Sequence, residues 1–230
     1  MKRTILFICI IYCILIPSQN KILKGVGIFQ INKTNISVID SLKNNGFKEE
    51  YCRSNYKCVR NTANDKYILL PLEDQIERPL IDDHKVVWIS HYTIADIDIS
   101  DMKLEFYKDI LYSIEINGVS ELEEALQTKY FNVHSKKYNT VSCTSMFGII
   151  KKEGWMFTTN FTKDPKIKSI AKNEKYYNDD CEERYLSYML IYDLSTDANV
   201  RSKENIQRQI IDKNENEKLK LELKNKYKDL

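Results

Sequence analysis

The sequence has few of the residues from which recognisable catalytic motifs are built. Only 6 glycines, 4 prolines and 3 histidines occur in 230 residues. No glycine-rich phosphate loop and no Gly-x-Ser-x-Gly turn is present, so nucleotide chemistry and acyl transfer have no visible motif. The 6 cysteines include no Cys-x-x-Cys pair, which removes the usual signatures of a thiol redox centre and of a zinc site. The sequence therefore predicts no catalytic residue, no metal site and no cofactor.

The beginning of the chain has the pattern of a secretory signal peptide. Lys2 and Arg3 precede an apolar run over residues 5–16, and Ser18 supplies a small residue before a cleavage point. The run is shorter than the roughly 20 apolar residues that a transmembrane helix needs. We therefore expect residues 1–18 to be removed, and the mature chain to be periplasmic or secreted without a transmembrane anchor.

Charge in the expected mature chain is balanced. The full chain has 35 lysines and arginines against 33 aspartates and glutamates, and two of the basic residues belong to the leader. A neutral chain without a separate basic stripe lacks the electrostatic footprint that binding to a phosphate backbone requires. We therefore expect no nucleic-acid partner. An envelope or extracellular protein is the expected partner, and the oligomeric state stays open.

Four cysteines remain after the leader: Cys52, Cys58, Cys143 and Cys181. An even number in an exported chain predicts disulfides, and four cysteines permit three pairings. The short spacing between Cys52 and Cys58 favours a local bridge, which leaves Cys143 to pair with Cys181. We expect these bridges to have a structural role.

Hydrophobic periodicity predicts an α+β fold with an antiparallel sheet, two packed helices and a charged C-terminal helix. The helices are expected over residues 36–45, from a Ser120-x-x-Glu123 capping box onward, and within residues 199–230. Residues 47–66 are expected to form a polar loop, and Lys108-Asp109 a hairpin turn. Strands are expected over the ranges 28–31, 67–70, 86–99, 104–107, 110–116, 155–161, 166–177 and 185–192, the last of which could instead be helical.

These elements predict one α+β domain over residues 19–198, followed by the charged helix. Their order, helix and strands followed by helix and strands, leaves a second arrangement open, in which two helix-plus-sheet units lie in tandem. No repeat is visible at the level of single residues. The single domain is the preferred interpretation.

Three segments carry a resemblance to a known group of proteins. Residues 27–31 run into a capped helix, Leu-Tyr-Ser-Ile-Glu-Ile follows at 111–116, and Glu-Leu-Glu-Glu-Ala-Leu-Gln-Thr-Lys-Tyr stands at 121–130. This pattern resembles uncharacterised exported α+β proteins of Bacteroidota. In element order alone, the chain is similar to units of the β-lactamase-inhibitor-like and outer-membrane-assembly-lipoprotein families, although it lacks their lipobox. The resemblance implies an envelope location and no enzymatic role.

Tyrosines in polar stretches near the cysteines are the candidate contact residues: Tyr51, Tyr56, Tyr176 and Tyr177. The expected function is that of a non-catalytic binding module, which acts through its sheet face or its C-terminal helix. One alternative is a hydrolase that uses His91 with Asp96 or Asp98 as a histidine–carboxylate pair. Another alternative is a secreted or periplasmic inhibitor protein.

Overall fold

The computed structural model describes residues 21–44, 47–53, 56–61, 68–70, 79–99, 101–145 and 148–226. The predicted signal peptide, residues 1–18, lies outside these ranges. The described part of the chain contains three helices, and its strands are mostly short near the N-terminus and longer toward the C-terminus. Their bounds are β1 (Gly25–Val26), β2 (Phe29–Gln30), α2 (Ser37–Asn44), β3 (Phe47–Arg53), β4 (Tyr56–Asn61), β5 (Ile68–Leu70), β6 (His84–Ile94), β7 (Ile97–Ile99), β8 (Asp101–Tyr107), β9 (Ile110–Asn117), α3 (Ser120–Gln127), β10 (Val133–Ser145), β11 (Gly148–Asn160), β12 (Ile167–Tyr177), β13 (Glu183–Asp193) and α4 (Leu194–Lys226).

One large antiparallel sheet runs through the molecule. Its strand order is β10-β11-β12-β13-β9-β8-β6-β5-β4-β3, with β7 paired to β6 beside this path. β1 and β2 form a separate two-stranded hairpin. The mostly antiparallel α+β fold predicted from the sequence is therefore confirmed at this level, and the two stretches considered as tandem units share a single sheet.

The hydrophobic core lies in the part that we call the body, which consists of β1–β9 with α2 and α3. On β8, every second side chain points inward, and Met102, Leu104 and Phe106 are 0% exposed. This alternation follows from the two-residue period of a strand. Leu122 of α3 and Ile39 of α2 close the same core from the helices.

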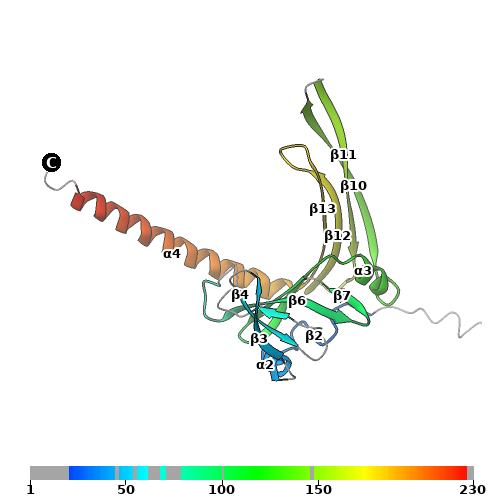
Figure 1. Ribbon diagram of the computed structural model, residues 1–230, viewed down its shortest axis with the longest axis horizontal. Helices are drawn as coiled ribbons and strands as arrows, with labels where there is room; N and C mark the ends of the chain where they lie inside the picture. Colours follow the sequence, from blue (N-terminus) through cyan, green and yellow to red (C-terminus); the bar gives the residue numbers. More distant parts are fainter. Residues whose placement is uncertain are drawn as a thin grey trace, which may run out of the picture.

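Strands β10–β13 form a second part that we call the arm. They extend together away from the body, with α3 at their base, while α4 leaves the body in another direction (Figure 1). The base of β12 and β13 shares the core through Ile167, Met189 and Ile191. Farther out, β10 and β11 pair over all 13 residues of each strand, whereas the β11–β12 ladder runs only from Trp155↔Lys175 to Asn160↔Ile170.

The tight turn between β8 and β9 confirms one of the predictions. Lys108 and Asp109 both have positive φ, 50° and 63°, which is the backbone geometry of a two-residue hairpin turn. The helix predicted over residues 36–45 is present as α2, and the segment at 185–192 belongs to strand β13 rather than to a helix.

Two predictions of irregular or single-strand structure are wrong. The polar stretch predicted as a loop over residues 47–66 contains the β3–β4 hairpin, which is polar because it lies at the outer edge of the sheet. The strand predicted over residues 86–99 is broken, because Ala95 and Asp96 have positive φ and reverse the chain between β6 and β7. Strand β10 and the first part of β11 lie over residues 133–154, for which the sequence predicts no strand because these residues lack clear apolar alternation.

The C-terminal helix begins at Leu194, earlier than the predicted start at residue 199. Asp193 caps it, because its carboxylate accepts hydrogen bonds from the Ser195 hydroxyl at 2.7 Å and the Thr196 backbone N–H at 2.8 Å. Burial alone would raise the pKa of Asp193, but these bonds and one from Asn32 lower it to about 2. The helix is thus anchored at its start, whereas residues 212–223 are all exposed.

Candidate functional site

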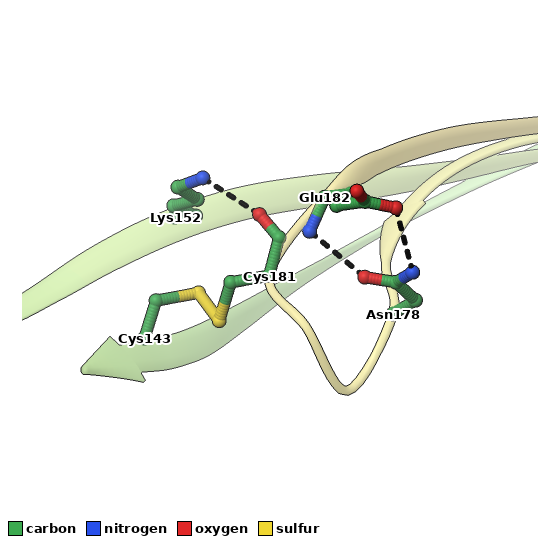
Figure 2. Close-up of a disulfide and its surroundings, with 5 residues drawn as sticks. All are labelled: Cys143, Lys152, Asn178, Cys181 and Glu182. Carbon is green, nitrogen blue, oxygen red and sulfur yellow. Dashed lines mark hydrogen bonds between the residues drawn. A yellow bond between two sulfur atoms is a disulfide. The ribbon is translucent and has the colours of Figure 1, made fainter. Parts of the chain in front are cut away.

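A disulfide joins the two hairpins of the arm near their tips. Cys143 lies on β10 and Cys181 lies in the turn between β12 and β13, with Cα atoms 5.8 Å apart (Figure 2). This bridge is one of the two predicted pairings, and it is confirmed. Cys52 and Cys58 belong to β3 and β4, and their side chains lie outside the described residues. Their bridge therefore stays a prediction.

Hydrogen bonds fix the turn that carries Cys181. The Asn178 side chain accepts a bond from the Glu182 backbone N–H at 2.8 Å and donates one to the Glu182 carboxylate at 3.2 Å. From β11, the Lys152 ammonium donates to the Cys181 carbonyl at 2.8 Å (Figure 2). Together with the disulfide, these bonds hold the β12–β13 turn against the β10–β11 hairpin.

One side of the arm carries a cluster of aromatic rings. Cross-strand register places Tyr138, Trp155, Lys175 and Tyr185 in one row across the four strands, and Phe157 follows Trp155 by two residues on the same side. The Trp155 ring centroid lies 4.7 Å from that of Phe157 and 6.5 Å from that of Tyr185. We call Tyr138, Trp155, Phe157 and Tyr185 the aromatic face. Tyr138 is 59% exposed and Tyr185 is 66% exposed.

A lysine lies over two of these rings. The Lys136 ammonium is 4.6 Å from the centroid of Tyr138 and 4.3 Å from that of Phe157. Both distances fall in the range of cation–π attraction. The aromatic face therefore combines apolar ring area with a positive charge.

Glu183 orders the edge of the aromatic face. Its carboxylate pairs with the Lys175 ammonium at 2.7 Å and accepts hydrogen bonds from the hydroxyls of Tyr177 and Tyr185. Hydrogen bonds from Lys175 and from the two tyrosines lower the pKa of Glu183 to about 2. The same ion pair raises the pKa of Lys175. These charges persist at neutral pH and restrain the Tyr185 ring.

A buried carboxylate fixes the base of the arm. Glu123 of α3 is 7% exposed and accepts hydrogen bonds from the Thr159 hydroxyl on β11, from Asn173 on β12 at 2.6 Å and from Gln127 at 3.1 Å. His134 Nδ1 lies 3.0 Å from the same Thr159 oxygen. Asn173 is the cross-strand neighbour of Phe157, so this network ends where the aromatic face begins.

The network corrects the predicted capping box. The N-cap of α3 is Val119, which makes no side-chain cap hydrogen bond, and Ser120 is already the first helical residue. Glu123 therefore faces the sheet rather than the free amides of the first turn. The helix itself is confirmed, but the role of its glutamate differs from the prediction because tertiary hydrogen bonds to two strands replace a local one.

The predicted contact tyrosines are only partly placed by the structure. Tyr176 and Tyr177 are half-buried on β12, and Tyr177 belongs to the Glu183 network. Tyr51 and Tyr56 lie on β3 and β4, and their side chains are outside the described residues. None of the four residues of the aromatic face is among the contact residues predicted from the sequence. Its signal in the sequence is the Trp-x-Phe alternation at 155–157, but the strands that bring Tyr138 and Tyr185 beside it could not be aligned without the register.

A second group of polar residues lines a cleft between the sheet and α4. The cleft has a volume of about 820 Å³. Within it, His84 Nδ1 lies 2.9 Å from the Glu204 carboxylate of α4, and His84 Nε2 lies 3.6 Å from the Glu105 carboxylate of β8. The Glu105 carboxylate accepts a hydrogen bond from the Tyr112 hydroxyl at 2.6 Å. The Lys103 ammonium lies 3.0 Å from the same carboxylate.

These contacts shift the pKa values of the groups in the cluster. Burial would raise the pKa of Glu105, but bonds from His84, Lys103 and Tyr112 lower it to about 2. Burial and the Glu105 charge raise the pKa of Tyr112. Burial would lower the pKa of His84, but its two glutamate neighbours raise it. The contact between His84 of β6 and Glu204 of α4 ties the helix to the sheet.

Of the histidine–carboxylate pair considered from the sequence, the structure describes the side chains of the two aspartates alone. Asp96 lies in the β6–β7 turn and is exposed, and Asp98 on β7 accepts a hydrogen bond from Thr93 at 2.9 Å. The His91 side chain lies outside the described residues. His84 does meet two carboxylates, and no local pattern in the sequence could have joined it to Glu204.

Within the described ranges, no helix has both the length and the apolar character that crossing a bilayer requires. Comparison with known proteins gives no relative from which a role could be transferred. No family model, no curated protein and no solved structure matches this chain.

Proposed function

We propose that this chain is an exported, non-catalytic binding protein that holds a protein partner of the envelope or the cell exterior at the aromatic face of its arm. The observation that carries the proposal is the position of Tyr138, Trp155, Phe157 and Tyr185. These rings form one group on a projecting, disulfide-bonded arm, and two of them are more than half exposed. Grouped exposed aromatic side chains are typical of protein contact surfaces.

The chemistry of this face indicates the kind of partner. Tyrosine and tryptophan lose little conformational entropy on binding, and here Glu183 and the neighbouring strands already restrain the rings. Lys136 adds a positive charge above Tyr138 and Phe157. A partner surface with an apolar centre and an acidic group near Lys136 fits best.

The export that this role requires is supported by two features. Residues 1–18 have the signal-peptide pattern, and the Cys143–Cys181 bridge suits an oxidising compartment. An inhibitor protein would use the same kind of surface and would be one member of this class.

The test is crosslinking in the producing cells, with a tagged mature chain and mass spectrometry of the captured proteins. The test variant carries Tyr138→Ser and Tyr185→Ser. The matched control is Leu186→Ser, since Leu186 is the exposed neighbour of Tyr185 that points to the opposite side of the arm. All three chains are compared at equal abundance.

We expect one dominant partner with the wild-type chain and with Leu186→Ser, and a loss of about tenfold or more with the tyrosine variant, as for contact residues at an interface centre. A partner retained equally by the tyrosine variant would contradict the proposed site. Capture of nothing, or of other copies of this chain alone, would contradict the proposed function.

A further inference from the structure

We infer that the outer edge of β10 pairs antiparallel with the β10 edge of a second copy of this chain, centred on Asn139. The resulting dimer would extend the sheet across a two-fold axis. This inference concerns the strand edge rather than the aromatic face, so it goes beyond the proposed function.

The first observation is the edge itself. β10 is 13 residues long and lies at the end of the sheet order, and no strand among the described residues pairs with its outer side. Its side chains are exposed from Val133 to Thr140. Each edge strand presents a row of backbone N–H and C=O groups, and a strand of this length offers a template for pairing with another strand.

The second observation is how charge is distributed along β10. His134, Lys136 and Lys137 all lie in its first half, and residues 138–145 carry no charged side chain. Antiparallel pairing over the full length lays the basic half of one strand against the uncharged half of the other. Parallel pairing in register would place each lysine opposite its own copy, which is unfavourable.

The full-length register defines specific neighbours. With Asn139 on the two-fold axis, Lys136 faces Ser142 of the partner subunit and Lys137 faces Val141 of the partner subunit. A register centred nearer the lysines would oppose like charges, and one centred farther along would leave part of the edge unpaired. Charge and length therefore select the same arrangement, which has the isologous symmetry of most dimers.

The pairing also has a consequence for the aromatic face. Residues directly opposite each other in an antiparallel pair point to the same side of the sheet, so Tyr138 lies on the same side as Thr140 of the partner subunit. The two aromatic faces then lie on one side of a continuous sheet. A dimer would present two copies of the proposed contact surface to a partner.

The test uses a charge swap whose rescue requires two chains. Ser142→Lys places a lysine opposite Lys136 of the partner subunit on both sides of the axis, and it also places one opposite Lys151 within the same chain. Adding Lys136→Glu turns the intermolecular pair into an attraction and leaves the repulsion from Lys151 unchanged. Within one strand, positions 136 and 142 are about 20 Å apart, so they cannot compensate each other directly.

The measurement is the dimer dissociation constant of the mature chain by sedimentation velocity over a concentration series. We expect wild type to dimerise, Ser142→Lys to weaken the dimer about tenfold or more, and the double variant to recover most of that loss. Lys136→Glu alone is the control and should change the constant little, because its expected neighbour is Ser142 of the partner subunit. Thermal unfolding at low concentration checks that each monomer folds.

A cysteine at the axis gives a second, independent readout. Asn139→Cys should form a covalent dimer under mild oxidation, whereas Lys136→Cys should not, since the two copies of residue 136 would be about 20 Å apart. A wild-type chain that stays monomeric up to about 100 μM would overturn the inference. So would a dimer that Ser142→Lys leaves intact, or a double variant as weak as Ser142→Lys alone. None of these results bears on capture of another protein by the tyrosines, so the two proposals fail separately.

Discussion

The hairpins β8–β9 and β10–β11 have the same antiparallel pairing but depend on different interactions. In the body hairpin, Leu104, Phe106 and Ile114 are completely buried. In the arm hairpin, the first eight residues of β10 and the first four of β11 are exposed. Both hairpins have a ladder of backbone hydrogen bonds, so the difference between the two regions lies in their side-chain interactions. The body is stabilised by apolar burial, whereas the arm depends on a disulfide, cross-strand contacts and its attachment to α3.

That difference has a functional meaning. A hairpin stabilised by its core can expose few apolar side chains, because they are needed inside. The arm can present Tyr138 and Tyr185 to solvent because the Cys143–Cys181 bridge and the Glu123 network supply its order instead. Changes in one region should therefore leave the other largely intact.

The largest contrast is expected from removing one phenylalanine in each region. Phe106→Ala should lower the free energy of unfolding by about 3–5 kcal/mol, because a fully buried ring leaves a cavity. Phe157→Ala should cost roughly 1 kcal/mol or less, because its ring is partly exposed. Denaturant unfolding followed by circular dichroism measures both. Equal losses would show that the arm has a core of its own.

Breaking the disulfide should loosen the arm alone. With the bridge spanning 38 residues, loop-closure entropy gives a contribution of about 3–4 kcal/mol, an upper value if the released chain keeps residual structure. Cys143→Ser with Cys181→Ser should therefore speed amide exchange near the tips of β10–β13 and leave β8 and β9 protected. Hydrogen exchange with mass spectrometry resolves these segments. Loss of protection in the body would mean that the two regions unfold together.

Removing the buried carboxylate should weaken the junction between arm and body. Glu123→Ala leaves Thr159 and Asn173 without their acceptor, which costs about 1–3 kcal/mol. Glu121→Ala is the control on the exposed side of the same helix. Thermal unfolding measures the difference between the two variants, and a larger loss from the control would contradict the assigned role of Glu123.

The smallest effect is expected where α4 meets the sheet, and it should depend on pH. The pKa of folded His84 is raised above its ordinary value of 6.5 by Glu105 and Glu204. The charged contact with Glu204 is therefore complete below about pH 6.5 and is lost as the pH rises through the raised pKa. The cleft around His84 also holds Lys103 of β8, Tyr112 of β9 and three charged residues of α4, namely Asp197, Arg201 and Arg208, and Glu105 stays ionised because its pKa is about 2.

The matching experiment compares wild type with Glu204→Gln by the protection factors of α4 amides at pH 6 and pH 9. At pH 6 the variant should lose about 1–2 kcal/mol of local stability, as expected for a hydrogen bond between charged groups. At pH 9 the local stability of α4 should be nearly the same in the wild type and in the variant. A difference that stays constant or grows with pH would contradict the charged His84–Glu204 contact.

The body could be predicted from the sequence better than the arm, for a physical reason. Leu104-Glu105-Phe106 shows the apolar alternation that burial of one face imposes, and Lys108-Asp109 interrupts it at the turn. Residues 133–145 form an equally regular strand without that pattern, because both of its faces are largely exposed. The aromatic face and the His84 cluster were invisible for a related reason, since each joins residues far apart in sequence.

The most direct test of the contact surface uses a photo-crosslinking amino acid at Tyr185 and, separately, at Leu186. The two positions are adjacent on β13 but point to opposite sides of the arm, and both are exposed. Crosslinking in the producing cells should attach one protein partner at position 185 and give little or no product at 186. Equal yields at the two positions, or a partner found at 186 alone, would contradict an aromatic contact surface.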